Sequence, residues 1–515
     1  MADTSAAPEG AMAISAEDPS AAERTRLVTE VDRLRARFPK YPKRYLYILM
    51  AVGAVDAADR TILATVIEDI RRAFDVSDSQ IGWLIGAYGV VAALSVLPFG
   101  WLADRWNRVW LIALGFIPWS IAMFWAGAAQ SFTMMFAARM FLGSIEATNG
   151  PSTPSLLGDY YPVKERGRVF GIYGIGALIG TLMGFALAGV LATIFDWRTA
   201  FFVWGAMGIV CGIAVWRLLP EPPRGIPDAL DGAEAALATH DATTVTPATE
   251  ATTQLDEPVS TDRDCDYRHL SLWEATREIA RVRTMWITFV AGFAGEFFFS
   301  AIASWAPTFF RRYHGFSAAG AGSLVALLAL SVVGGIVVGG RFSDRQLAAG
   351  HPARRIRMAG FADIAAVFTL LISFGFDSLP VIVPLFIASG FLIGIPMAPL
   401  SAVGLDIMVP HLRGRAAAIR SVLRVSAVAV APILFGYLSD QYGLRTALLA
   451  IAPMLGVGGL ITLLAIRTYP RDMAYAQSES LRQQQLEDEL GHELADPDIL
   501  HSGAHSVMVE EIARD

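Results

Sequence analysis

Charged residues are scarce in this 515-residue chain. Asp, Glu, Lys and Arg make up only 17% of it, 54% is hydrophobic, and the mean hydropathy is +0.46. Soluble domains carry about 25% charged residues. The apolar residues also gather in blocks of about 20, the length of helix that crosses a bilayer. The low charge therefore excludes an ordinary soluble protein and predicts a chain that crosses a membrane many times.

Catalytic and cofactor-binding motifs are also lacking. The two cysteines, Cys211 and Cys265, predict no disulfide framework. All eight histidines fall in expected loops, linker or tails, and neither an HExxH segment nor Cys-His ligand spacing occurs. No Gly-x-x-x-x-Gly-Lys loop is present for ATP phosphates. We therefore expect no enzyme, no cofactor, no metal and no ATP drive. The formal net charge of −7 comes from acidic tails and linker, so we expect no nucleic-acid partner.

Twelve apolar helices are expected, six on each side of a polar linker at 224–283. Their ranges are 45–67, 81–103, 109–129, 132–158, 167–194, 198–219, 286–310, 318–340, 356–376, 380–408, 416–438 and 445–467. The linker is rich in Ala, Thr, Asp and Glu, which suits a flexible segment. The pattern predicts an all-α membrane protein of two six-helix bundles. The expected parts are a tail at 1–44, bundles at 45–219 and 286–468, a linker at 220–285 and a tail at 469–515.

The distribution of Lys and Arg among the short loops orients these helices. With both termini inside, the inner loops carry twelve Lys and Arg and the outer loops carry six. This bias predicts that both ends and the linker are cytoplasmic, in a plasma (inner) membrane. The N-terminal residues lack the regions of a cleaved signal peptide, so we expect the first span to direct insertion. A basic amphipathic helix within 23–44 and a short capped helix at 271–283 are expected at the interface.

The two halves repeat each other. The matched segments are GWLADRWNR (100–108) with GRFSDR (340–345), YPVKERGRVFG (161–171) with VPHLRGRAAA (409–418), and DWRTAF (196–201) with DQYGLRTAL (440–448). Repeated halves are typical of transporters that bind substrate at the interface of the repeats, near the bilayer midplane. An Asp-Arg pair at a helix end could hold neighbouring helices together in one conformation. We therefore predict a gating motif made of Gly100, Asp104, Arg105, Arg108, Asp344 and Arg345.

These segments resemble the major facilitator superfamily, as do RMFLGSIEA (139–147) and the duplicated Arg-Gly-Arg loops. Asn107 and Val109 depart from that pattern, which usually has glycine and a basic residue there. Within the superfamily the chain is most similar to the spinster-type transporters, through DAADR, EDIRRAFDVSDSQIG, DRWNR and EPPRG. Asp56 and Ala57 stand where that group has asparagine and tyrosine. The resemblance implies the major facilitator fold, a monomer, and substrates such as sphingosine phosphates and lysolipids.

Ionisable residues lie inside the expected spans, where they are costly and usually mark a pathway. Asp56, Asp59 and Arg60 share a face of the first helix, and Arg139 and Glu146 lie two turns apart on the fourth. The resemblance implies that these two helices face each other across a cavity. We expect Asp59 and Glu146 to compete for Arg139. Protonation of one carboxylate would then free the guanidinium for an anionic head group.

The predicted function follows from these charges. Proton coupling is assigned to Asp59, Glu146 and Asp56, and substrate binding to Arg139, Arg60, Glu296 and Arg424. We predict a proton-coupled transporter of amphiphilic anionic lipids that works by alternating access within the membrane lipids. Open alternatives are a transporter of a small organic anion, a multidrug exporter, and a receptor without transport. For the N-terminal charges the alternative is a fixed salt-bridge knot. A structural role is favoured for Asp363, and Asp406 is expected to snorkel to the interface.

Overall fold

The computed structural model describes eight stretches of the chain: 19–37, 43–146, 148–225, 227–230, 233–234, 237–238, 272–409 and 412–494. Every regular element within them is a helix. The first half contains α1 (Pro19–Arg37), α2 (Arg44–Phe74), α3 (Asp78–Arg105), α4 (Arg108–Gly127), α5 (Phe132–Glu146), α6 (Asn149–Tyr160), α7 (Val163–Ile194) and α8 (Trp197–Leu218). The second half contains α10 (Leu272–Arg281), α11 (Arg283–His314), α12 (Ala318–Ala348), α13 (Pro352–Gly375), α14 (Leu379–Asp406), α15 (Arg413–Tyr442) and α16 (Leu444–Leu494).

Ten of the described helices are long and apolar enough to cross a membrane. They are α3, α4, α7, α8 and α11 to α16. α2 is 31 residues long, and charged side chains along it reduce its apolar character. The single helix expected over 132–158 is wrong, because α5 ends at Glu146 and a separate helix starts at Asn149. Pro151 explains the interruption, since proline has no N–H to continue the hydrogen-bond ladder of α5 and is tolerated in the first turn of a helix.

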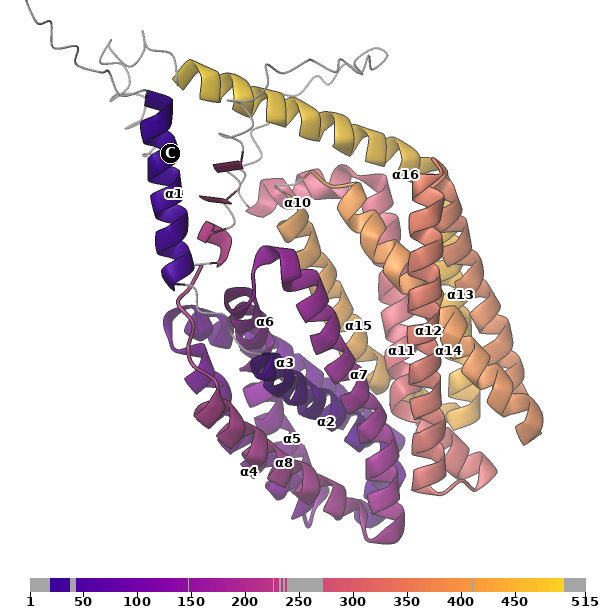
Figure 1. Ribbon diagram of the computed structural model, residues 1–515. Helices are drawn as coiled ribbons and strands as arrows, with labels where there is room; N and C mark the ends of the chain where they lie inside the picture. Colours follow the sequence, from indigo (N-terminus) through magenta and orange to yellow (C-terminus); the bar gives the residue numbers. More distant parts are fainter. Residues whose placement is uncertain are drawn as a thin grey trace, which may run out of the picture.

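The helices form two bundles that stand side by side, α2 to α8 in purple and α11 to α16 in pink to yellow (Figure 1). Within the first bundle α2 packs on α7 and α4 on α8, and within the second α12 packs on α14 and α13 on α16. Two seams join the bundles: α3 packs on α15, and α7 packs on α12. The internal repeat relates α3 to α12 and α7 to α15, so the two seams are equivalent.

We call the end of the bundles that carries α10 and residues 219–225 the linker side, and the opposite end the far side. Both seams are tightest toward the far side. A Cβ added at Gly82 of α3 would lie 2.4 Å from the Pro432 carbonyl oxygen of α15. One added at Gly322 of α12 would lie 2.1 Å from the Phe185 carbonyl oxygen of α7. Glycine therefore lets the backbones of the two halves touch directly.

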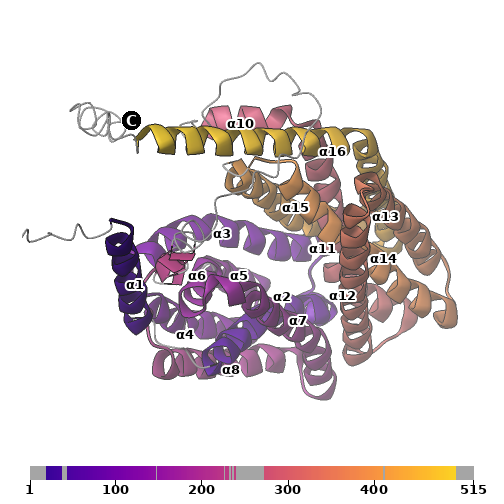
Figure 2. The same cartoon turned by 45° about the horizontal axis from the view of Figure 1, so that its top comes forward.

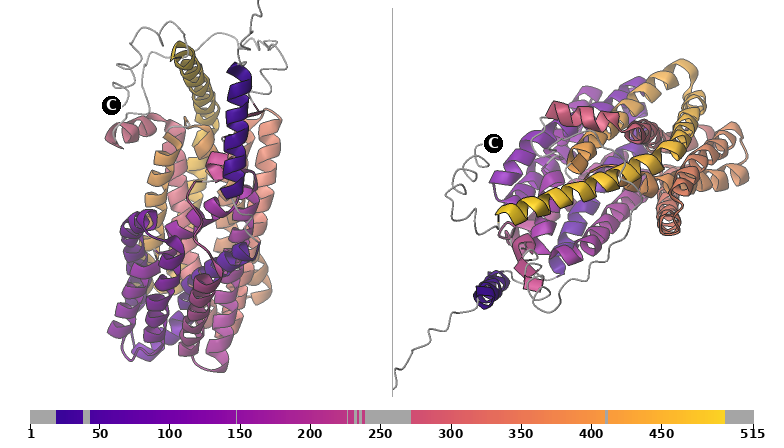
Figure 3. Two further views of the ribbon diagram at one scale, coloured as in Figure 1. Left: turned by 60° about the vertical axis from the view of Figure 1, so that its left-hand side comes forward. Right: turned by 90° about the horizontal axis from the view of Figure 1, so that it is seen from above.

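Two helices, α1 and α10, and the C-terminal part of α16 lie on the linker side, outside the bundles (Figure 1). α1 stands away from the helices of its own half, and its Arg35 binds Glu234 at 2.9 Å. α16 continues far beyond its bundle and runs across the linker side beside α10 (Figures 2 and 3). The helices expected within 23–44 and 271–283 correspond to α1 and α10. The proposed cap at Ser271, the linker residues 239–271 with Cys265, and the tail 495–515 lie outside the described residues.

Candidate substrate and proton site

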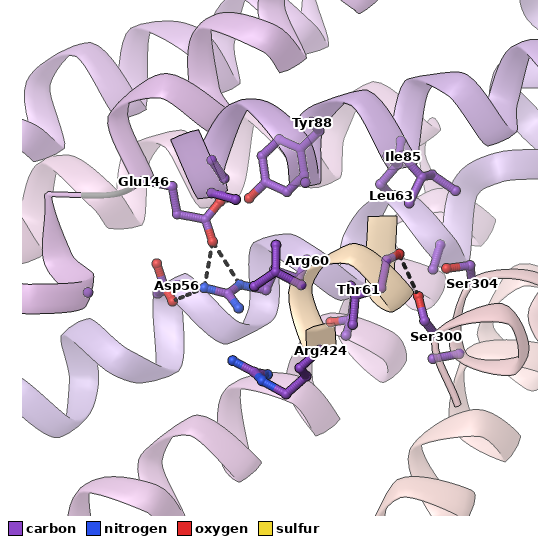
Figure 4. Close-up of a pocket in the computed structure, with 18 of the residues that line it drawn as sticks. Asp56, Arg60, Thr61, Leu63, Ile85, Tyr88, Glu146, Ser300, Ser304 and Arg424 are labelled. Carbon is purple, nitrogen blue, oxygen red and sulfur yellow. Dashed lines mark hydrogen bonds and ion pairs between the residues drawn. The ribbon is translucent and has the colours of Figure 1, made fainter. Parts of the chain in front are cut away.

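A cavity of about 480 Å³ lies between the two bundles. Its walls come from α2, α3, α5, α6 and α7 of the first half and from α11 and α15 of the second. Six charged residues line it: Asp56, Arg60, Arg139, Glu146, Glu296 and Arg424. Figure 4 labels four of them, Asp56, Arg60, Glu146 and Arg424. All four residues predicted to bind substrate therefore border one space. We call it the central cavity.

Arg60 is held by two carboxylates on the wall of the central cavity. Its guanidinium approaches Glu146 at 2.7 Å and Asp56 at 3.1 Å (Figure 4). Asp56 lies one turn before Arg60 on α2, whereas Glu146 is the last residue of α5. The Arg60 side chain is 60% exposed, so its free edge faces the cavity. The expected pairing of Glu146 with Arg139 is wrong, because Glu146 lies within reach of Arg60 instead.

Arg139, which also borders the central cavity, binds Asp59 inside the first bundle. Their 2.9 Å ion pair joins α5 to α2, and each side chain is only 1% exposed. The Arg139 guanidinium also lies over the Tyr88 ring, 4.6 Å from its centre. Asp59 does not line the central cavity, although it was expected on the same face as Asp56 and Arg60. A helix advances 100° per residue, so Asp59 points into the bundle while its neighbours face the cavity.

These ion pairs leave buried polar atoms unsatisfied. Within the described part of the chain, Asp59 Oδ2, Glu146 Oε2 and Arg139 Nε have no hydrogen-bond partner. A buried carboxylate oxygen without a donor is costly, and adding a proton to it lowers that cost. The two carboxylates therefore have the chemistry of proton acceptors.

The second half contributes one acid and one base to the central cavity. Glu296 comes from the middle of α11, and Arg424 comes from α15. Neither forms an ion pair with another residue that the structure describes. Their charges are thus available to a bound molecule, in contrast to the paired charges of the first half.

Ion pairs on the far side join the two halves. Arg312 of α11 binds Glu68 of α2 and Asp78 of α3, each at 2.6 Å. Arg311 of α11 donates hydrogen bonds to both carboxylate oxygens of Asp69 of α2, each at 2.6 Å. Bidentate pairs between guanidinium and carboxylate groups are among the stronger charged contacts in proteins. We call these five residues the far-side lock.

The lock continues onto the seam between α3 and α15. Asp440 of α15 accepts hydrogen bonds from the backbone N–H groups of Asp78 and Ser79, at 2.9 and 2.8 Å. Ser439 donates to the Asp78 carboxylate at 2.6 Å. This site was not predicted, because in the sequence Arg311 and Arg312 are simply two of the six basic residues of the outer loops. The clustering of EDIRR and FRR at the ends of two spans was the available signal.

On the linker side, each half contains a buried arginine that binds within that half, and the two lie at equivalent places. Arg108, at the start of α4, binds Asp159 of α6 at 2.5 Å and Glu221 at 2.8 Å. Arg355, at the start of α13, binds Asp406 of α14 at 2.5 Å. The expectation that Asp406 snorkels to the interface is wrong, because Arg355 and the hydroxyl of Tyr469 hold it. The repeat thus places the same kind of buried ion pair within each half.

The other residues of the predicted gating motif lie on the exposed linker side. Arg105 stacks on Trp101 at 4.3 Å. Asp344 and Arg345 are exposed, and a Cβ at Gly100 would meet nothing within 4 Å. The side chain of Asp104 lies outside the described residues.

Residues 49–432 match the Major Facilitator Superfamily. The chain belongs to this superfamily. It is a transporter with a multi-pass integral membrane fold, and not an enzyme. Transporters of this superfamily move a substrate, generally as monomers.

Individual relatives of this superfamily member point in two directions. The crystal structure of a bacterial homologue of the human lysosomal transporter spinster, inward-facing and unoccupied, has a TM-score of 0.70. It is 22% identical and covers 84% of this chain and 99% of that one. Human spinster homologue 3 is 30% identical over 29% of this chain and 30% of its own length. A probable L-galactonate transporter of Escherichia coli is 23% identical over 76% of this chain and 82% of its own.

Proposed function

We propose that this chain is a proton-coupled secondary transporter of amphiphilic anionic lipids, of the lysophospholipid or sphingosine-phosphate type. It works by alternating access. The charged head group binds in the central cavity between Arg60 and Arg424, and the hydrocarbon tail lies in an apolar crevice that opens from it.

In this proposal α2 and the α5–α6 pair also cross the membrane, which brings the number of spans to twelve. The burial of Asp59, Arg139 and Glu146 inside the first bundle supports this, because charges in spanning helices face the protein interior. Both termini and the linker side are cytoplasmic, and the membrane is the plasma (inner) membrane. The far-side lock is closed, so the conformation described is open toward the cytoplasm.

The main support for a lipid substrate is this crevice. It has a volume of about 300 Å³ and lies among α2 and α7 of one half and α11 and α12 of the other. Its inner end is shared with the central cavity, where Asp56 and Arg60 line both. Its outer part is apolar and includes Ala177, Leu328 and Ala329. A charged cavity that continues into an apolar crevice between the halves matches a molecule with an anionic head and one hydrocarbon tail.

Arg60 couples this binding to protons. With Asp56 and Glu146 both ionised, the three groups carry a net charge of −1 and repel an anion. Protonation of Glu146 makes the trio neutral and releases donors of Arg60 for the head group. Asp59 serves as a second acceptor, since its protonation weakens the hold on Arg139. In this proposal Arg60, whose side chain is exposed to the cavity, takes the head-group role predicted for Arg139.

A small organic anion is the second candidate. The likeness to the probable L-galactonate transporter spans about three quarters of this chain, whereas the likeness to human spinster homologue 3 spans less than a third. Two arginines in the central cavity would also suit a sugar acid. Such a substrate would fill the central cavity and leave the crevice empty.

Blocking the crevice separates the two candidates. Ala329 lines the crevice but not the central cavity, and its neighbour Leu330 points away from the protein, 49% exposed. Ala329→Phe and the control Leu330→Phe are reconstituted into liposomes with an imposed pH gradient. Uptake of a fluorescent lysophospholipid and of radiolabelled galactonate is measured in parallel.

If the substrate is a lipid, the Ala329→Phe variant should lose most of its lysophospholipid uptake, and the Leu330→Phe variant should keep it. Lysophospholipid uptake that is the same in both variants contradicts the role of the crevice. Galactonate uptake, stimulated by the gradient and indifferent to both substitutions, would establish the second candidate.

A further inference from the structure

A second cavity lies inside the C-terminal bundle, beside the central one. Its volume is about 180 Å³, and its walls come from α11, α13, α14, α15 and α16. Glu296 and Arg424 line both cavities, so the two spaces share a wall. We call the second space the side cavity. It has no part in the binding of the head group or tail described above.

Asp363 of α13 is the buried acid of the side cavity. Its side chain is only 6% exposed. α16 covers it with glycine: a Cβ added at Gly459 would lie 2.9 Å from the Cβ of Asp363. Within the described ranges no hydrogen bond or ion pair reaches the Asp363 carboxyl. This distinguishes it from Asp59 and Glu146, which each bind an arginine.

The groups that face Asp363 across the side cavity come from two helices. α11 supplies Glu296, and α15 supplies Arg420 and Arg424. α14 contributes Ser401 and apolar residues, and α16 contributes Leu455 and glycine, so neither adds a titratable group. α12 packs against α13 but does not line the cavity. None of the three charged side chains is ion-paired with a described residue.

This arrangement suits a proton better than a fixed salt bridge. A carboxylate taken out of water without a donor is unstable in its charged form, and protonation removes the charge. Glu296 stands between the side cavity and the central cavity, so a proton can reach Asp363 from the cytoplasmic opening by way of a second carboxyl. A purely structural aspartate would be met by a donor on a neighbouring helix, as Asp406 is met by Arg355 and Tyr469.

We propose that Asp363, reached through Glu296, is a second proton-binding site, located in the C-terminal half. Asp363 takes up a proton as a neutral carboxylic acid while the central cavity is open to the cytoplasm. The proposal extends the proton coupling inferred above from the first half to the second. It requires only that the side chain changes protonation state, whichever substrate is carried.

Infrared titration tests this without any substrate. Attenuated total reflection spectra of the purified, reconstituted protein are recorded from acidic to alkaline pH, and the C=O stretch of protonated carboxyl groups is followed. We compare wild type, Asp363→Asn and the control Asp377→Asn, since Asp377 is an exposed aspartate on the far side, 82% accessible. One titrating band should be lost in Asp363→Asn and retained in Asp377→Asn. A titration in Asp363→Asn identical to that of wild type overturns the proposal.

Glu296→Gln keeps the test decisive if Asp363→Asn fails to fold. Removing the neighbouring carboxyl changes the electrostatic surroundings of Asp363 and should shift the pH at which its band titrates. No shift overturns the proposal, because a proton on Asp363 would respond to the loss of the neighbouring Glu296 charge. Failure of the lipid-uptake experiment leaves this result unaffected, so the two proposals fail separately.

Discussion

Arg312 of α11 binds Glu68 of α2 and Asp78 of α3 at the same time, each at 2.6 Å, and so ties the two halves together on the far side. One guanidinium thus spans the interface that must separate if the transporter is to open outward. Under the proposed alternating access, opening of the far side would separate Arg312 from both carboxylates and Asp78 from Ser439 of α15. The strength of these contacts therefore sets how long the protein stays closed on the far side.

Arg312→Gln should weaken this closed state. Loss of a charged hydrogen-bonded pair costs about 2 kcal/mol, which corresponds to a shift of roughly thirtyfold in the open-to-closed ratio. Double electron–electron resonance measures the distance distribution between two spin labels, one on Ala73→Cys of α2 and one on Tyr442→Cys of α15. Cys211 and Cys265 are first replaced by serine. A longer distance should appear beside that of the wild type.

Arg445→Gln is the matched control for this experiment. Arg445 also lies on the far side, but it bonds only within the second half, to Asp377 and to the carbonyl oxygens of Phe374 and Gly375. Its loss should leave the distance distribution unchanged. Equal distributions in all three proteins would mean that the seams between the helices, and not Arg312, hold the far side closed.

The glycines of α7 give a stability prediction. A Cβ at Gly180 would lie 1.9 Å from the Ala54 carbonyl oxygen of α2, whereas a Cβ at Gly174 would meet nothing within 4 Å. Gly180→Ala must therefore push α2 and α7 apart, at a cost of about 1–3 kcal/mol. Gly174→Ala should be neutral. Thermal unfolding in detergent, followed by tryptophan fluorescence, should show a lower Tm for the first only; equal Tm values would contradict the tight seam.

Arg108 tests whether the predicted gating motif works between or within the halves. It is buried against Asp159 and Glu221 of its own half, and removing one partner of a buried charged pair costs about 3–5 kcal/mol. Arg108→Met should thus reduce the yield of monodisperse protein in size-exclusion chromatography. Arg105→Met, on the exposed side of the same segment, should not. A stable Arg108→Met protein with altered transport would restore the gating role.

The helices were predictable from the sequence because a segment that lies in hydrocarbon must be predominantly apolar along its length. Blocks of apolar residues marked the spans, and most helices of the structure begin a few residues before the predicted start. The break between α5 and α6 was missed, since the hydropathy of the segment does not change at Pro151. The glycines at 171–184 look alike in the sequence, but a Cβ at Gly171 or Gly174 would meet nothing within 4 Å. Only the position of α2 decides which of these glycines are needed.

The site was predictable as a set of residues but not as a set of pairs. Charges in apolar runs identified Arg60, Arg139 and Glu146, because burying them has a cost that the fold must answer. Which carboxylate pairs with which arginine depends on how the helices are rotated about their axes. In the structure Glu146 pairs with Arg60. The far-side lock was missed for a different reason. Arg312 lies at a helix end, where arginine is common, and its partners on α2 and α3 are more than 230 positions away in the chain.

Glu146 should control the pH dependence of substrate binding. Because Glu146 and Asp56 share Arg60, protonation of Glu146 raises the charge of the trio from −1 to 0 and favours an anionic head group. Binding in wild type should therefore strengthen as pH falls, by up to about tenfold per pH unit for one coupled proton. Glu146→Gln fixes the trio in its neutral state, so its affinity should be high and nearly independent of pH.

Equilibrium binding of a lysophospholipid analogue at acidic and alkaline pH measures this, with Glu165→Gln as the control, because Glu165 is exposed at the start of α7. Exchange of labelled for unlabelled lipid should persist in Glu146→Gln, since it needs no net proton movement, while accumulation driven by a pH gradient should be lost. If Glu146→Gln keeps the pH dependence of the wild type, the proton is bound elsewhere. Arg60, Asp56 and Glu146 would then be a fixed knot that holds α2 against α5.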